Sequence, residues 1–130
     1  MGNQATLLYG YETIAEISSG QVLADTLTSL RGSFRVSRPA FDLVYSEDIH
    51  LIIGLSEDWC WLHYLNERTG YYLPKNDANS EGTTYFMFGG HHTEVLQRNC
   101  VDFETVLLVV HAFLQNGELP AEVIEWEELR

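Results

Sequence analysis

Five histidines and two cysteines are the side chains of this sequence best suited to act as nucleophiles, bases or metal ligands. The histidines are His50, His63, His91, His92 and His111. Together with the cysteines they form neither a His-Glu-x-x-His nor a Cys-x-x-Cys pattern, the spacings typical of zinc sites. His91 and His92 are adjacent and would point to opposite faces of a strand. We therefore expect structural or surface roles for the histidines, and no metal or cofactor.

The thiols show no sign of nucleophilic chemistry. Cys60 and Cys100 both adjoin apolar residues, which favours buried free thiols over a disulfide. His63 follows Cys60 by three positions, so in a strand the two side chains point to opposite faces and form no catalytic pair. The Gly-x-Ser-x-Gly, P-loop and dinucleotide-binding patterns are absent from the sequence. Because the carboxylates cluster in turns and near the C-terminus rather than in a restricted pocket, we expect no enzyme.

The charge balance of the 130-residue chain limits its choice of partner. Nineteen Asp and Glu residues against seven Lys and Arg residues give a net charge of −12. This excess argues against nucleic acid and anionic membranes, which both require clustered cations. It fits a basic protein partner, or it serves only to keep the protein soluble. Residues 1–11 lack the features of a secretory signal and no segment is apolar enough to span a membrane, so we expect a cytoplasmic location.

Three segments place aromatic residues beside acids: Tyr45 to Asp48, Glu57 to Trp59 and Glu125 to Glu127. Aromatic anchors ringed by charge are typical of protein interfaces. The alternative is that the rings face the core while the acids face solvent. The residues that this pattern predicts for partner binding are Glu47, Asp48, Glu57, Asp58, Trp59, Glu125 and Glu127.

Apolar residues at intervals of three and four predict two helices. The first covers about residues 20–31 and begins after Ser18-Ser19, where a serine oxygen is available as a cap. The second covers residues 102–116, with Asp102 as its N-cap and Gly117 as a left-handed stop.

Apolar and aromatic runs bounded by turn residues predict the strands. These runs are Ala5–Tyr11, Phe41–Tyr45, His50–Leu55, Trp59–Leu65, Tyr71–Leu73 and Thr83–Phe88. Short turns join the second, third and fourth runs, which favours an antiparallel meander. Aromatic residues at both parities of the fourth run suit a strand covered on both faces, or one at an interface.

The remaining segments complete a single α+β domain over residues 1–130. Residues 74–82 are polar and predict a surface loop, and residues 123–127 predict a last short strand or an extended arm. No repeat or Pro/Gly/Ser-rich linker divides the chain. We expect a mainly antiparallel sheet of about five to seven strands packed by the two helices.

The last two-thirds of the chain resembles the Imm-one family of immunity proteins, which belong to bacterial polymorphic toxin systems. In that family a helix ends in a Phe-x-x-x-Gly-x-x-Pro pattern and a tryptophan follows shortly after. Here Phe113, Gly117, Pro120 and Trp126 fall on those positions. The run from Trp59 to Tyr64 also resembles the central strand of the family.

This resemblance implies a non-catalytic inhibitor that binds a toxin carrying a nuclease or deaminase domain and blocks its active site or substrate groove. An acidic protein suits the basic groove of such a toxin. The resemblance also implies that Gly117 and Pro120 shape the helix exit, and that Trp126 packs on the core or contacts the partner. Both a monomer and a homodimer fit the sequence. The alternatives are an unrelated acidic protein- or ligand-binding module and, last, an enzyme without a sequence signature.

Overall fold

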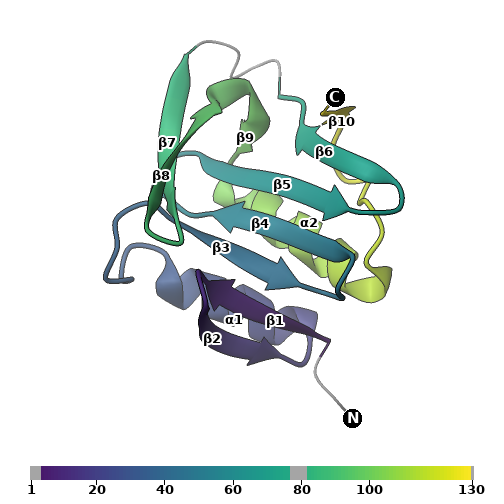
Figure 1. The fold of residues 1–130 in the computed structure, drawn as a ribbon, viewed down its shortest axis with the longest axis horizontal. Coiled ribbons are helices and arrows are strands. Elements are labelled where there is room, and N and C mark those ends of the chain that lie inside the picture. The colour runs from purple at the N-terminus through teal and green to yellow at the C-terminus, as the bar shows by residue number, and fades with distance from the viewer. Residues whose placement is uncertain (1–3, 77–81, 130) are drawn as a thin grey trace.

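Ten strands form one sheet within residues 4–76 and 82–129, the parts of the chain that the computed structural model describes (Figure 1). The strands are β1 Ala5–Tyr9, β2 Glu12–Ile17, β3 Pro39–Val44, β4 Ile49–Gly54, β5 Cys60–Asn66, β6 Gly70–Pro74, β7 Thr83–Phe88, β8 His91–Leu96, β9 Cys100–Val101 and β10 Trp126–Glu128. Its main path runs β10-β6-β5-β4-β3-β1-β2. All pairings are antiparallel except that of β3 with β7, and β3-β4-β5 confirm the predicted meander.

The α+β class is confirmed, but the prediction of five to seven strands is wrong. It misses β2, β8 and β9, because β2 and β8 are rich in polar residues and β9 has two residues. β2 and β8 form because each folds back on the preceding strand across a two-residue turn, Gly10-Tyr11 and Gly89-Gly90. β10 confirms the predicted short final strand. The predicted surface loop lies mostly outside the described residues, since 77–81 are not among them.

Both helices begin at the residues predicted to cap them. Ser19 precedes α1 (Gly20–Leu30), Asp102 precedes α2 (Phe103–Asn116), and each cap side chain accepts a bond from a backbone N–H of the first turn. A left-handed Gly117, with φ of 74°, ends α2. In the described part of the chain, no helix is long and apolar enough to cross a membrane.

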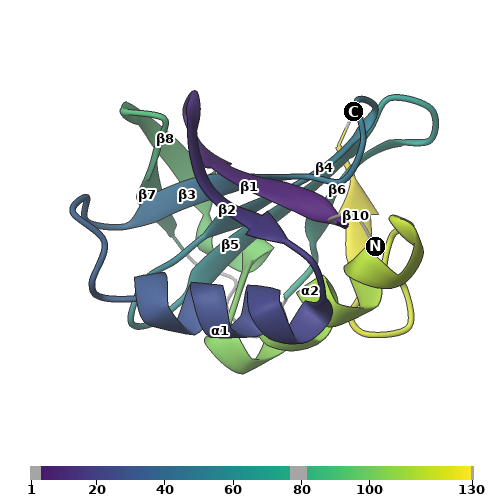
Figure 2. The same ribbon diagram turned by 90° about the horizontal axis from the view of Figure 1, so that it is seen from below.

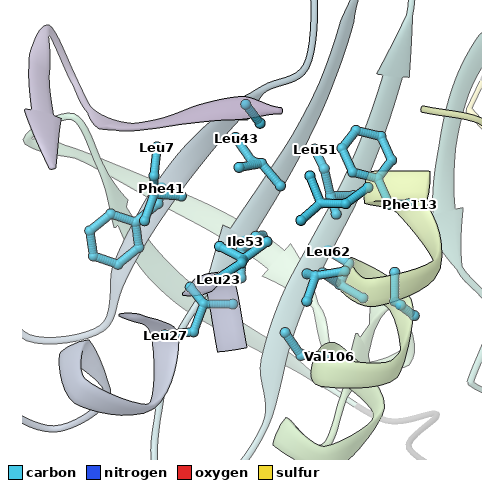
Figure 3. Packing of buried hydrophobic residues seen from close by; sticks show 14 of the residues in the cluster. Leu7, Leu23, Leu27, Phe41, Leu43, Leu51, Ile53, Leu62, Val106 and Phe113 are labelled. Atoms are coloured by element: carbon cyan, nitrogen blue, oxygen red, sulfur yellow. The ribbon is translucent and has the colours of Figure 1, made fainter. Parts of the chain in front are cut away.

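The two helices cover the same face of the sheet (Figure 2). The main core lies between these two layers, where alternate residues of the central strands meet the apolar stripes of the helices (Figure 3). Members of this core that have no exposed surface include Leu7, Leu23, Leu27, Phe41, Leu43, Leu51, Ile53, Leu62, Val106 and Phe113. Burying each of these side chains stabilises the fold by roughly 1.5–3 kcal/mol.

A smaller core lies on the opposite face of the sheet. It is covered by the β7–β8 hairpin, which Figure 1 shows at one end of the strands. There the ring of Phe86 stacks on that of Trp61, with centroids 6.0 Å apart, and fills the space above Gly54. The hairpin therefore covers one end of this face, and β5 is covered on both faces at Trp61 but not along its whole length.

Candidate partner-binding site

Two rows of side chains point away from the helices on the part of the sheet beside the β7–β8 hairpin. They alternate along each strand with the core residues. Direct cross-strand pairs join the members of each row. One row is Leu8, Asp42, Ile52 and His63, and the other is Val44, His50, Leu65 and Tyr71. These eight residues are named the open face.

The open face is more apolar than the free face of an antiparallel sheet usually is, since such faces alternate with polar residues toward water. Five of its eight side chains are aliphatic or aromatic, and every one except Ile52 is at least partly exposed. Exposed apolar patches on small proteins mark interaction sites. The five strands that carry the open face, at about 4.8 Å spacing, span only ~19 Å, so a partner that buries about 800 Å² must also cover the surrounding turns.

Asp42 and His50 form the one charged contact described within the open face. The imidazole Nδ1 of His50 lies 2.9 Å from a carboxylate oxygen of Asp42, and because an ionised carboxylate only accepts, Nδ1 donates. The other ring nitrogen, Nε2, lies 3.4 Å from the backbone carbonyl oxygen of Glu47. The ring is thus held between a carboxylate and a carbonyl, and not against a hydroxyl or thiol that it would activate.

His63 is a third partly buried titratable group of the open face, besides Asp42 and His50. Its Nε2 is shielded from water and has no hydrogen-bond partner among the described residues. The ring lies beside that of Trp61, with centroids 6.0 Å apart. Burial disfavours the charged imidazolium and lowers the pKa of His63 from its ordinary value of 6.5. The folded protein therefore holds His63 neutral at pH 7.

We expect the protein to lose stability as the pH falls from 7 to 5, and His63→Gln to reduce that loss. The unfolded chain binds a proton at His63 near pH 6.5, while the folded chain does so only at lower pH, so acid favours unfolding. The contribution of His63 stays below the ~1.4 kcal/mol per pH unit of one whole proton, because the ring is only partly removed from solvent. Urea unfolding at several pH values measures this slope. The exposed His91→Gln is the control, and equal slopes in both variants would contradict the prediction.

The cysteines confirm their predicted state. Cys60 and Cys100 are free and buried, and burial raises the pKa of both thiols, that of Cys100 to about 12. Cys60 faces the helices and His63 the opposite side of the sheet, as the spacing predicts. Among the described residues, no three His, Cys, Asp or Glu side chains are grouped closely enough to hold a metal ion.

The residues predicted for partner binding lie at separate places. Glu47 and Asp48 form the β3–β4 turn, and Glu57 to Trp59 form the β4–β5 turn at the other end of β4. The six residues of β4 hold these turns about 20 Å apart. Glu125 lies in the C-terminal segment and lines a hollow of about 470 Å³ together with Trp59. The structure thus brings Trp59 and Glu125 together, and leaves Glu47 and Asp48 apart from them.

Two of the predicted carboxylates are tied to arginines of the same chain. Asp48 lies 3.2 Å from the guanidinium of Arg68, and Glu127 lies 2.9 Å from that of Arg98. Asn99 donates a further bond of 2.8 Å to Glu127. Since Glu127 thereby joins β10 to the turn before β9, its carboxylate serves the fold.

Asp58 is held by its own turn. Its carboxylate accepts hydrogen bonds from the Ser56 hydroxyl and from the backbone N–H of Trp59, and lies 3.6 Å from the guanidinium of Arg38. These contacts, the bond from Ser56 foremost, lower the pKa of Asp58. The Trp59 ring packs partly buried against the smaller core. The predicted acids that remain exposed, with no ion-pair partner in the described part of the chain, are Glu47, Glu57 and Glu125.

The C-terminal motif forms one structural unit. The buried ring of Phe113 packs edge-on against that of Tyr64, whose hydroxyl donates a 2.8 Å bond to the Gly117 carbonyl. The backbone N–H of Gly117 donates back to the Phe113 carbonyl, 2.7 Å away. The indole N–H of Trp126 donates to the carbonyl of the buried Pro120, at 3.1 Å. Trp126 therefore packs on the core as expected.

Most of the open face was missed at the level of sequence. The signal was available in the strands β4 and β5, where His50 and Ile52, or His63 and Leu65, occupy the parity opposite to that of the core residues. Apolar residues at both odd and even positions of a strand indicate that both of its faces are buried. They do not tell whether each face is buried by the same chain or by a partner. Sequence reasoning favoured the acidic turns instead, because charge is easier to recognise than an uncovered surface.

Comparison with known proteins gives one family. The family model described as immunity protein Imm1 matches residues 17–128, which is most of the chain and includes β3 to β10 and both helices. A search of curated proteins found no match.

Proposed function

Because the chain belongs to the Imm1 family of immunity proteins, we propose that it binds a cognate bacterial toxin and neutralises it without catalysing a reaction. The observation that carries the proposal is the open face, an apolar surface on the layer opposite the helices of a chain with net charge −12. Apolar side chains at the centre of an interface supply most of its affinity, and charge around it guides the partner. The complex would form in the cytoplasm of the cell that makes both proteins.

Two acidic turns border the second row of the open face. The β3–β4 turn lies against it through His50, whose ring contacts the Glu47 carbonyl. The β5–β6 turn is bonded to the β3–β4 turn, because the Glu67 N–H donates a 2.9 Å hydrogen bond to the Asp48 carbonyl. The Glu67 carboxylate accepts a 2.8 Å hydrogen bond from the Tyr71 hydroxyl. We name Glu47, Asp48 and Glu67 the acidic rim. Because Arg68 pairs with Asp48, it is Glu47 and Glu67 that supply the net negative charge next to the exposed Tyr71, and tyrosine is a common anchor residue.

This arrangement favours a basic partner over a second copy of the chain. Two copies would bring together surfaces of the same sign, and like charges across an interface cost free energy. A nuclease or deaminase domain carries a cationic groove for nucleic acid, which matches the rim in sign. We propose that the open face and rim cover that groove and exclude its substrate. Glu57 and Glu125, at the far end of the molecule, would act through the long-range field.

Co-expression with the toxin domain encoded beside this gene tests the proposal. We expect a complex that survives size-exclusion chromatography and cells that survive toxin production. The isolated toxin domain should lose its activity on nucleic acid when one equivalent of this protein is added. A toxin that stays active, or that the protein inactivates at far less than one equivalent by turnover, would end the proposal.

Replacing Glu47 and Asp48 with lysine is expected to slow association with the toxin about tenfold at low salt, since electrostatic steering sets the rate of encounter. The effect should shrink at 0.5 M salt, where charges are screened within a few ångströms. Stopped-flow mixing at several salt concentrations measures the rate. The control changes the charge equally at Glu118 and Glu122, two exposed residues beyond the end of α2. Equal slowing by both double variants would show that net charge, and not the rim, steers the toxin.

A further inference from the structure

Two hairpin turns meet at one corner of the open face (Figures 1 and 2). The β1–β2 turn and the β7–β8 turn approach so closely that a Cβ on Gly89 would lie 3.2 Å from the Gly10 Cα. Both glycines have positive φ, and a Cβ on Gly89 would force the turns apart by a few tenths of an ångström. The Gly90 N–H donates a 3.3 Å bond to the Tyr9 hydroxyl. The β1–β2 and β7–β8 turns are thus in direct contact and form one continuous surface.

A hollow of about 430 Å³ lies at this corner. Its walls include the rings of Tyr11 and Phe88 and the carboxylates of Glu12 and Asp42. Asp42 belongs to the open face, so the hollow opens beside the surface proposed for docking. Gly10, Gly89 and Gly90 line the hollow at the two turns, and they have no side chains that could occupy it.

The walls favour a cation. Glu12 is paired with Arg35, and the Arg35 guanidinium lies over the Phe34 ring at 4.8 Å and near the Tyr9 ring at 5.8 Å. Arg35 itself lines the hollow, so one arginine already lies at this corner beside Tyr9 and Glu12. The two carboxylates of the walls, Glu12 and Asp42, thus stand against one guanidinium, that of Arg35, and this excess of acids disfavours an anion.

We propose that this hollow receives the side chain of one arginine of the toxin. A planar guanidinium stacks on an aromatic ring and bonds a carboxylate with two parallel N–H donors, and lysine offers neither geometry. Tyr11 is wholly exposed at the tip of its turn and stacks on the guanidinium, while Asp42 accepts its hydrogen bonds. The inference rests on the proposed function for the identity of the partner, and on the walls of the hollow for the chemistry.

An NMR titration with N-acetyl-arginine amide tests the hollow without any toxin. We expect saturable shifts of the Gly10, Gly89 and Gly90 amide signals, and no such shifts with the citrulline analogue, which has the same shape and no charge. Asp42→Asn and Tyr11→Ala should each weaken binding about threefold or more. Glu94→Gln, a carboxylate on β8 outside the hollow, should leave it unchanged. Because Tyr11 is fully exposed, its variant keeps the fold and isolates the role of the ring.

The outcomes separate this inference from the proposed function. Absence of saturable shifts, or equal shifts with citrulline, would refute the arginine site even if the toxin complex forms. Specific shifts together with no toxin complex would uphold the site and refute the proposed function. With the toxin in hand, the arginine whose substitution becomes silent in the Tyr11→Ala background identifies the side chain that enters the hollow.

Discussion

Replacing Gly117 with alanine is expected to lower the free energy of unfolding by about 2–5 kcal/mol. Two costs combine at this position. A left-handed φ of 74° costs a non-glycine residue roughly 1–2 kcal/mol. A Cβ at residue 117 would also lie 2.5 Å from the Tyr45 ring, so the ring would have to shift. This shift would disturb the edge-on packing of Tyr45 against Phe113. Such overpacking costs roughly 1–3 kcal/mol. Urea unfolding followed by tryptophan fluorescence measures the change.

Gly90→Ala is the matched control. Gly90 also has positive φ, but a Cβ there meets nothing within 4 Å, so the variant incurs only the backbone cost of ~1–2 kcal/mol. The difference between the two variants isolates the contact with Tyr45. Equal losses would mean that the ring yields freely and that the glycine of the C-terminal motif matters only for its backbone.

Replacing Leu65 with lysine is expected to weaken binding of the toxin at least 100-fold, about 3 kcal/mol. Leu65 lies at the centre of the second row, between His50 and Tyr71. Against the basic partner proposed above, a lysine there would be desolvated and would add like-charge repulsion to the loss of apolar contact. The free protein should keep most of its stability, since the side chain is partly exposed. Isothermal titration calorimetry with the toxin domain measures the affinity.

Leu108→Lys provides the control for this substitution. Leu108 is 63% exposed on α2, in the layer opposite the open face, and the exchange adds the same charge. It should alter toxin affinity less than threefold. If Leu108→Lys abolishes binding and Leu65→Lys does not, the toxin docks on the helices and the open face has another role.

Sequence predicted the elements that carry strong local signals. Ser19, Asp102 and Gly117 fixed the helix boundaries because caps act through neighbouring backbone groups only. The central strands were recognised because their apolar runs end in turn residues. β2 and β8 were missed because their pairing energy comes from the strand before them and not from their own composition.

The site was harder to predict than the fold. Acidic residues stand out in a sequence, yet Asp58 and Glu127 are bonded within the chain, to Ser56 and Arg98 among others. The open face depends on long-range register, since Asp42 meets His50 only once β3 and β4 pair. Such a surface can be recognised only when it is known which elements pack on each face of the sheet.

The alternation of β3, β4 and β5 separates two tasks within the same strands. Phe41 and Leu43 of β3 are wholly buried, while Asp42 and Val44, which alternate with them, face outward. The outward-facing residues can therefore change to bind different partners, while the inward-facing residues keep the core and the fold unchanged. A library randomised only at Val44, His50, Leu65 and Tyr71 should remain largely folded and supply variants that bind different partners.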